Sequence, residues 1–272
     1  MPGDDARDQL VRDGAVGLPG LLDAAWCHRL RGAIERCRRA PSIHYGVLSP
    51  PGTPVVDSDL FRWTDDPDIH AVTHCSPLVE CAAALLGVDA VVLIEDQWFA
   101  SEPGATTPSP WHQDQPYYRI DRPFLTIWVT LDDVAEDVSL QAVDGSHRGP
   151  LYAPVEFSAT VATVDVASAP APRPPASVGT EARSRSLRAG DGIALDSRTL
   201  HATGPGTVTA PFRRISTRWA EPAARYVAHP GATATFWDLV PHGLGDGDLL
   251  NCPAFPLVGS SRSRNKADPA GS

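Results

Sequence analysis

Short runs of β-branched and aromatic residues, separated by turns rich in Pro, Gly and Asp, fill the chain after Gly87. These runs are residues 90–94, 124–131, 140–143, 192–195 and 215–219. Their spacing is typical of an antiparallel sandwich or barrel and does not fit alternating β–α–β units. Hydrophobic residues make up 42% of the 272 residues, so a single β domain of this length can bury its own core.

Two helices are expected around the start of this region. Residues 20–40 carry apolar side chains at helical spacing, and Asp23 is a suitable N-cap. A second helix is expected over residues 77–86, because Ser76 can cap it, Pro77 suits its first position and Gly87 suits its end. The sequence therefore predicts a mainly β fold with flanking helices.

The run 124–131 alternates between two kinds of side chain. Leu125, Ile127, Val129 and Leu131 share one face of an extended strand, and Thr126, Trp128 and Thr130 share the other. The second face is polar enough to line a cavity.

Charge and composition narrow the set of partners. The net charge of −10 argues against an extended nucleic-acid footprint and against an anionic membrane surface. No apolar run approaches the roughly 20 residues needed to cross a bilayer, and the N-terminus has no apolar signal core. The five cysteines form no disulfide or metal-binding pattern. We expect a cytoplasmic protein, a monomer or a small homo-oligomer, with no nucleic-acid or membrane partner.

One long segment interrupts the strands. Residues 168–189 are rich in Ala, Pro, Ser and Arg, which is typical of a long mobile loop. We expect this segment to govern substrate access rather than folding. Residues 1–258 are expected to form one domain that includes the N-terminal helices and this insertion, and residues 259–272 a disordered tail.

A candidate metal site stands out among the nine histidines. His112 and Asp114 are separated by one residue, so in an extended strand both side chains point to the same side. His201, which follows the run 192–195, is the best candidate for a third ligand. Two histidines and a carboxylate with open positions form the facial triad of non-haem Fe(II) oxygenases. His147, at a turn in the segment GSHRG, is expected to be structural.

Several motifs occur in one order along the chain: WHQDQPYY, TIWVTLDDV, VDGSHRG, AGDGIALDSRTLH and RRISTRW. This series resembles the phytanoyl-CoA dioxygenase-like family of Fe(II)/2-oxoglutarate-dependent oxygenases. The resemblance implies a double-stranded β-helix (a cupin-like jelly roll) with catalytic iron held by His112, Asp114 and His201. It also implies 2-oxoglutarate as cosubstrate, O₂ as oxidant, and an arginine on a late strand that pairs with the distal carboxylate of 2-oxoglutarate. Related halogenating enzymes lack the carboxylate ligand, so Asp114 favours oxygenation.

The family pattern leaves two arginines as candidates for that pairing. Matching the end of the strand puts Phe212 at the expected place, whereas matching the arginine pair selects Arg213. Strand parity puts Arg214 on the same face as Phe212, so we predict that Arg214 rather than Arg213 binds 2-oxoglutarate, provided that no bulge shifts the register.

Other side chains are expected around the cosubstrate. Trp128 is predicted to contact it, and the pocket walls are expected to come from the aromatic residues Trp98, Phe99, Tyr117, Tyr118 and Trp128. Asp196 has two interpretations, a solvated turn residue or a partner that orients His201.

The function predicted from these features is oxidation of a small organic molecule, in a tailoring step of bacterial secondary metabolism. The alternatives are an acyl-CoA hydroxylase of the same family, a cupin-like metal enzyme that does not use 2-oxoglutarate, and a non-catalytic binding module. Hydroxylation, desaturation, epoxidation and rearrangement all use the same iron site, so the motifs leave the reaction type open.

Overall fold

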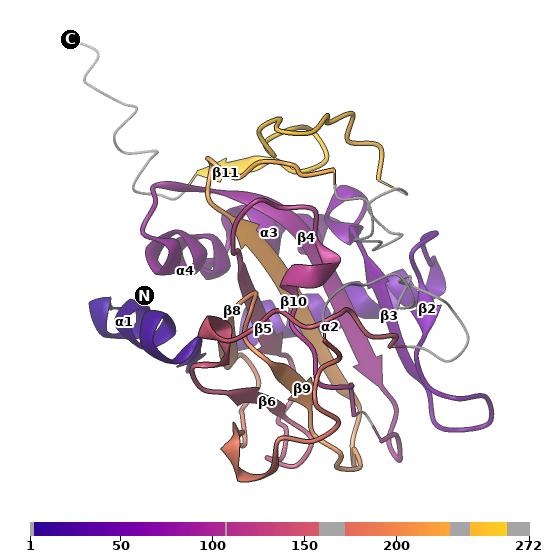
Figure 1. Ribbon diagram of the computed structural model, residues 1–272. Coiled ribbons are helices and arrows are strands. Elements are labelled where there is room, and N and C mark those ends of the chain that lie inside the picture. Colours follow the sequence, from indigo (N-terminus) through magenta and orange to yellow (C-terminus); the bar gives the residue numbers. More distant parts are fainter. Residues whose placement is uncertain (1–2, 107, 158–171, 229–239, 260–272) are drawn as a thin grey trace.

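The computed structural model in Figure 1 describes residues 3–106, 108–157, 172–228 and 240–259. The α-helices of these ranges are α1 (Asp4–Asp13), α2 (Ala24–Arg39), α3 (Pro67–Cys75) and α4 (Pro77–Leu86). Both helices expected from the sequence are confirmed. Asp23 caps α2 by accepting a hydrogen bond from the Trp26 N–H at 2.9 Å, and Ser76 caps α4.

Two antiparallel sheets form the body of the molecule. The larger sheet has the order β1-β8-β5-β10-β4-β3-β2, and β11 also pairs with β4. Its strands are β1 (Ala15–Leu18), β2 (Gly46–Val47), β3 (Val56–Leu60), β4 (Ala90–Ser101), β5 (Leu125–Thr130), β8 (Gly192–Asp196), β10 (Phe212–Ala220) and β11 (Leu257–Gly259). The smaller sheet has the order β7-β6-β9, with β7 at Ala182–Arg183, β6 at Leu140–Val143 and β9 at His201–Thr203. This two-sheet arrangement is the predicted jelly roll.

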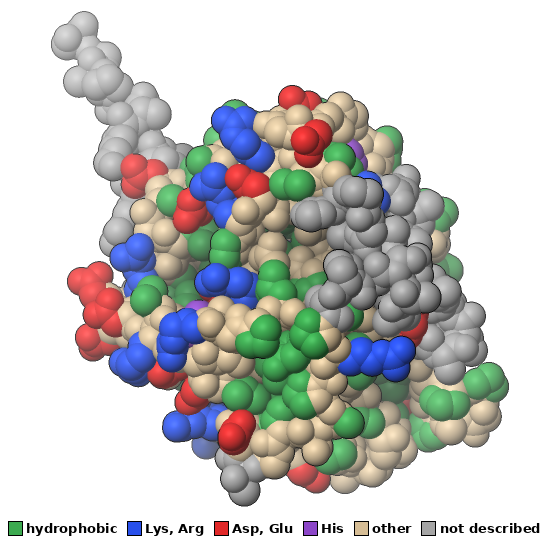
Figure 2. Space-filling model, viewed as in Figure 1, with side chains coloured by type: hydrophobic (Ala, Val, Ile, Leu, Met, Phe, Trp, Pro, Cys, Tyr) green, Lys and Arg blue, Asp and Glu red, His purple; other side chains and the backbone are tan. Residues whose placement is uncertain are grey.

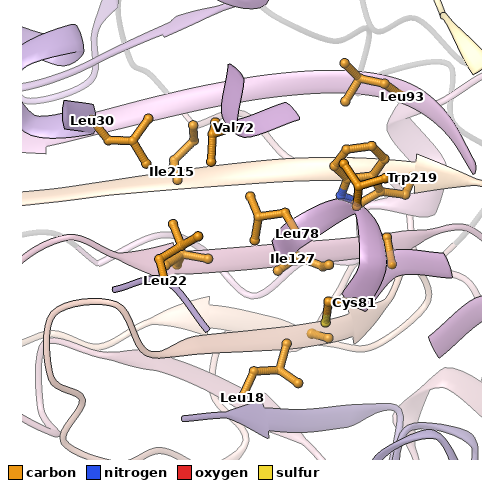
Figure 3. Close-up of a cluster of buried hydrophobic side chains, with 14 of the residues drawn as sticks. Leu18, Leu22, Leu30, Val72, Leu78, Cys81, Leu93, Ile127, Ile215 and Trp219 are labelled. Carbon is orange, nitrogen blue, oxygen red and sulfur yellow. The ribbon is translucent and has the colours of Figure 1, made fainter. Parts of the chain in front are cut away.

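The larger sheet uses its two faces differently. Ile127 of β5 and Ile215 of β10 lie in a buried cluster with Leu30 of α2 and Leu78 of α4 (Figure 3). The other face of β5 contributes Trp128 to a separate buried cluster inside the jelly roll. The alternation predicted for residues 124–131 is therefore confirmed, and the helices cover only the apolar face.

The segment 168–189 is not an irregular loop throughout. Residues 168–171 lie outside the described residues, but Ala182 and Arg183 form β7 and pair with β6. Leu187 forms a β-bridge with Val134, and only 6% of its surface is exposed. The expectation that the segment has no role in folding is wrong for residues 182–187, because Ala182 and Arg183 pair with β6 and Leu187 is buried. The predicted tail lies outside the described residues from 260 onward.

By length and composition alone, the helical stretch Pro67–Leu86 is apolar enough to cross a membrane, in contrast to the expectation that no apolar run approaches 20 residues. In the fold this stretch is α3 followed by α4, with a break at Ser76, and its apolar side chains Ile69, Val72 and Leu78 pack into the core cluster.

On the face of the molecule shown in Figure 2, basic and acidic side chains are intermingled.

Candidate active site

Backbone pairing brings the two predicted histidine ligands together. His112 and His201 form an antiparallel bridge, with N–H···O=C distances of 3.0 and 2.9 Å in the two directions. Directly opposed residues of such a pair point to the same side, so the two imidazole centroids lie 4.1 Å apart. Gln113, between His112 and Asp114, points away and bonds instead to the backbone of Pro150, Tyr152 and Arg198.

The three predicted ligands converge. Asp114 Oδ1 lies 3.7 Å from His112 Nε2 and 3.8 Å from His201 Nε2. Ligand atoms of all three residues lie within 4.8 Å of one another, and the three side chains are buried. This is the geometry that a single metal ion requires from three protein ligands.

Hydrogen bonds to backbone carbonyls determine which ring nitrogen of each histidine ligand carries the proton. His112 Nδ1 lies 2.9 Å from the Pro110 carbonyl, and His201 Nδ1 lies 2.8 Å from the Thr199 carbonyl. Because a carbonyl only accepts, each Nδ1 carries the proton and each Nε2 keeps its lone pair for a metal.

The carboxylate ligand is held through its other oxygen. Asp114 Oδ2 accepts a hydrogen bond from the Thr126 hydroxyl at 2.6 Å and one from Arg218 Nε at 3.3 Å. Burial by itself would raise the pKa of Asp114, but the charge of Arg218, followed by the two histidines, holds that pKa well below its usual range. Burial, reinforced by His201, lowers the pKa of His112 to about 3. The donor set of two imidazoles and an ionised carboxylate fits Fe(II).

The inner face of the larger sheet continues from this site along β10. Arg214, Ser216 and Arg218 point to this face. Their neighbours are Thr130, Trp128 and Thr126 on β5, and Phe99, Gln97 and Glu95 on β4. The only register shift between β10 and β4 lies after Arg218, so strand parity holds for both predicted arginines.

The two candidate arginines differ in environment. Arg213 makes a two-pronged ion pair with Asp132, with both N···O distances 2.9 Å. Arg214 is 4% exposed and makes no ion pair within the described residues. Its guanidinium bonds to the Ser101 hydroxyl at 3.1 Å and lies over the rings of Phe99 and Phe212. Burial lowers the pKa of Arg214 to about 9, because the loss of water outweighs the attraction of the Asp57 charge, which makes no ion pair with it.

The expected aromatic walls are partly correct. Trp128 lies on the inner face beside Phe212, and the Tyr117 ring stands edge-on to His112 at 6.2 Å. The expectation that Trp98 lines the pocket is wrong, because Trp98 points to the opposite face and packs in the core cluster under the helices. The long strand β4 alternates, so adjacent Trp98 and Phe99 cannot both face the site.

Two further sequence expectations are settled by contacts. Asp196 forms an ion pair with Arg198 at 3.0 Å, whereas His201 Nδ1 bonds to a backbone carbonyl. Asp196 is therefore the turn residue and not the partner of His201. His147 is structural, since its Nε2 donates to the Val11 carbonyl at 3.1 Å and ties the end of α1 to the turn.

Sequence reasoning missed a charged network behind the metal ligands. Arg218 bonds through Nη1 to Glu95 Oε1 at 2.6 Å, and the Tyr118 hydroxyl donates to the same oxygen at 3.0 Å. Glu95 is fully buried, and burial raises its pKa to about 7. Strand parity within β10 alone places Arg218 on the same face as Arg214. Only the pairing of β10 with β4 reveals that Glu95 lies opposite Arg218.

Fold and site together define a jelly-roll protein with a metal centre of two histidines and one carboxylate. The family model for phytanoyl-CoA dioxygenase (PhyH) matches residues 10–215, and the chain belongs to that family. It is therefore an enzyme of the non-haem Fe(II)/2-oxoglutarate-dependent dioxygenase class.

Solved structures share the fold at low sequence identity. The epimerase SnoN, in complex with Fe3+, alpha ketoglutarate and nogalamycin RO, is 21% identical with a TM-score of 0.75, covering 93% of this chain and 97% of its own. The carbocyclase SnoK from nogalamycin biosynthesis is 21% identical with a TM-score of 0.72, covering 94% and 96%. EvdO2 from Micromonospora carbonacea var. aurantiaca, complexed with 2-oxoglutarate, is 21% identical with a TM-score of 0.61, covering 85% and 95%. The comparison with curated proteins gave no match.

Proposed function

We propose that this chain is an Fe(II)/2-oxoglutarate-dependent oxygenase that oxidises a small organic molecule in a tailoring step of bacterial secondary metabolism. The observation that carries the proposal is Arg214, a buried guanidinium without a carboxylate partner among the described residues, on the same inner face as the residues that contact Asp114. A buried charge of this kind needs an anionic ligand to offset its desolvation.

Different residues of the chain would hold the metal and the cosubstrate. His112, His201 and Asp114 would hold the iron, and Arg214 would receive the distal carboxylate of 2-oxoglutarate. Residues four apart on a strand are separated by about 13 Å, so the row of Gln97, Trp128 and Ser216 lies between the arginine end and the Arg218 end of the site. Trp128 would therefore flank the bound cosubstrate, as predicted from the sequence.

The surroundings of Arg214 favour a carboxylate over water. The Phe99 and Phe212 ring centroids lie 4.9 and 4.7 Å from the guanidinium carbon. These rings exclude water from the guanidinium faces and leave its edge for a planar, bidentate contact. When bound, iron and 2-oxoglutarate supply the oxidising chemistry, while the protein orients them and keeps water out.

Two structural neighbours support this substrate class. SnoN and SnoK belong to nogalamycin biosynthesis, and they match this chain over nearly its whole length. The chain therefore fits a tailoring enzyme better than an acyl-CoA hydroxylase, because a net charge of −10 offers little attraction to the phosphates of CoA.

The test is anaerobic titration with Fe(II), followed by 2-oxoglutarate, monitored by the weak visible absorption of the Fe(II)–2-oxoglutarate chelate. We expect the band in the wild-type protein and its loss in His112→Ala, Asp114→Ala and His201→Ala, each of which should keep its fold. Absence of the band from wild-type protein at saturating concentrations would overturn the proposal. Any two alanine variants that keep more than about a tenth of wild-type succinate formation, a barrier change under about 1.4 kcal/mol, would overturn the ligand assignment.

A further inference from the structure

Within the described part of the chain, Arg218 bonds both to the carboxylate ligand Asp114 and to Glu95 on β4. Its Nε donates to Asp114 Oδ2 at 3.3 Å, and its Nη1 donates to Glu95 Oε1 at 2.6 Å. Its guanidinium carbon lies 5.4 Å from the centroid of the Tyr118 ring, and the Tyr118 hydroxyl bonds to the same Glu95 oxygen. The arginine is thus fixed on several sides, and its position determines which Asp114 oxygen is free.

The two carboxylate oxygens of Asp114 have different contacts. Oδ2 receives both Thr126 and Arg218, while Oδ1 is the atom that faces His112 and His201 at 3.7 and 3.8 Å. A carboxylate with both oxygens available can bind a divalent ion through both of them. Each additional oxygen would occupy one of the positions that a facial triad leaves open for ligands.

We propose that Arg218 is a positioning residue that keeps Asp114 a one-oxygen metal ligand, with Glu95 and Tyr118 holding Arg218 in place. This inference rests on the proposed metal site. Thr126 also restrains Oδ2, because its hydroxyl donates to the ionised carboxylate at 2.6 Å, a shorter distance than the 3.3 Å of the Arg218 contact. Only Arg218 also brings a positive charge that competes with the metal for Oδ2.

Glu95 explains how a positive charge can stay beside a metal ion. Glu95 is 1% exposed and aligned with Arg218 across the β4–β10 pair, so its charge offsets that of the guanidinium in the interior. Without Glu95 the arginine would share the single Asp114 carboxylate with the metal, and two positive centres on one buried carboxylate are costly. The order carboxylate–guanidinium–carboxylate therefore lets Arg218 hold Oδ2 without repelling the metal from Oδ1.

The experiment counts exchangeable water on the metal. Mn(II) replaces Fe(II), and the water-proton relaxation of the Mn(II)-loaded protein is measured with and without 2-oxoglutarate at saturating metal. If Arg218→Met releases Oδ2 to the metal, three open positions become two, so the relaxation enhancement without cosubstrate falls by about a third. With 2-oxoglutarate bound, the remaining enhancement is largely lost. Thr126→Val should give a smaller decrease, and Arg213→Met, on the outer face of the same strand, should give none.

A second variant tests the inference if Arg218→Met does not fold. Removing Arg218 alone leaves Glu95 as an unpaired buried carboxylate, so the double variant Glu95→Gln/Arg218→Met removes both charges and is measured in the same way. Relaxation equal to that of wild type in Arg218→Met, or in the double variant if the single variant does not fold, would overturn the inference. If wild-type protein fails to bind Mn(II), or if His112→Ala binds it equally well, the proposed metal site itself fails.

Discussion

Replacing Arg214 by methionine should separate cosubstrate binding from stability. Arg214 is buried without a carboxylate partner among the described residues, so the folded protein without ligand carries the cost of desolvating its charge. Methionine has a similar length, can fill the space between Phe99 and Phe212, and carries no charge. We therefore expect Arg214→Met to abolish tight binding of 2-oxoglutarate without unfolding the protein.

The magnitudes follow from the contacts of Arg214. Its pKa falls from 12.5 to about 9, which at about 1.36 kcal/mol per pKa unit means that burial, after the attraction of Asp57 is included, destabilises the charge by about 5 kcal/mol. The bond to Ser101 returns about 1.5–3 kcal/mol, and the two ring contacts return about 0.5–2 kcal/mol each. These terms nearly cancel, so the free energy of unfolding should change little or rise. Loss of the charge-assisted contact to 2-oxoglutarate costs about 1.5–3 kcal/mol, a 10- to 150-fold rise in Kd.

The assay compares two arginine variants on one strand. Anaerobic titration of the Fe(II)-loaded protein gives the Kd of 2-oxoglutarate, and urea denaturation of the metal-free protein gives the stability. Arg213→Met should leave the Kd within about twofold and reduce stability by less than about 1 kcal/mol, because its partly exposed pair with Asp132 is screened. The reverse pattern, with a weakened Kd only in Arg213→Met, would show that the assignment of the inner face is wrong.

The remaining predictions test the core, a buried carboxylate and the metal. Leu187→Ala should reduce the free energy of unfolding by about 2–5 kcal/mol in a denaturant titration, while the Kd of 2-oxoglutarate stays unchanged. Burial raises the pKa of Asp96 from 3.8 to about 7, so the folded state holds a proton that the unfolded state releases, and stability falls as the pH rises through this interval. Asp96→Asn should flatten that part of the stability–pH curve, and an unchanged curve would contradict the assignment. Fe(II) at one hundred times its Kd should stabilise the wild-type protein by about 2.7 kcal/mol in anaerobic thermal unfolding, and Asp114→Ala should lose this gain.

The fold could be predicted where local chemistry repeats along the chain. Helix α4 has a serine cap, a proline at its first position and a terminal glycine with φ of +74°, and these three signals alone fix its bounds. Strand β7 could not be predicted, because two residues have no period, and pairing with β6 is what makes them a strand. Helix α1 could not be predicted either, because its residues are mostly polar and it buries only Leu10.

The candidate site was predictable to the extent that its residues lie on one strand or share a spacing. The shared face of Phe212 and Arg214 depends only on strand parity. His112 and Asp114 do not lie on a strand, because His112 forms an isolated bridge with His201 and Asp114 has helical φ and ψ of −71° and −37°. Glu95 lies far from Arg218 in sequence, and its burial is visible only after β4 and β10 pair. Trp98 shows the limit of reasoning from composition, because an aromatic residue suits a core as well as a pocket wall, and its parity relative to Phe99 decides between them.

The side chains of strand β10 alternate between the core and the candidate site. Its odd positions Ile215 and Trp219 pack in the core cluster shared with the helices, so the strand cannot rotate or slide by one residue without exposing them. Its even positions Arg214 and Arg218 therefore take their direction from the strand, and Tyr118 and Asp114, which lie outside the strands, add further contacts to Arg218. A rigid strand holds a guanidinium more accurately than a loop can, and both the pocket for the cosubstrate and the restraint on Asp114 need that accuracy. The hydrophobic contacts under the helices thus determine where the charged groups of the site can stand.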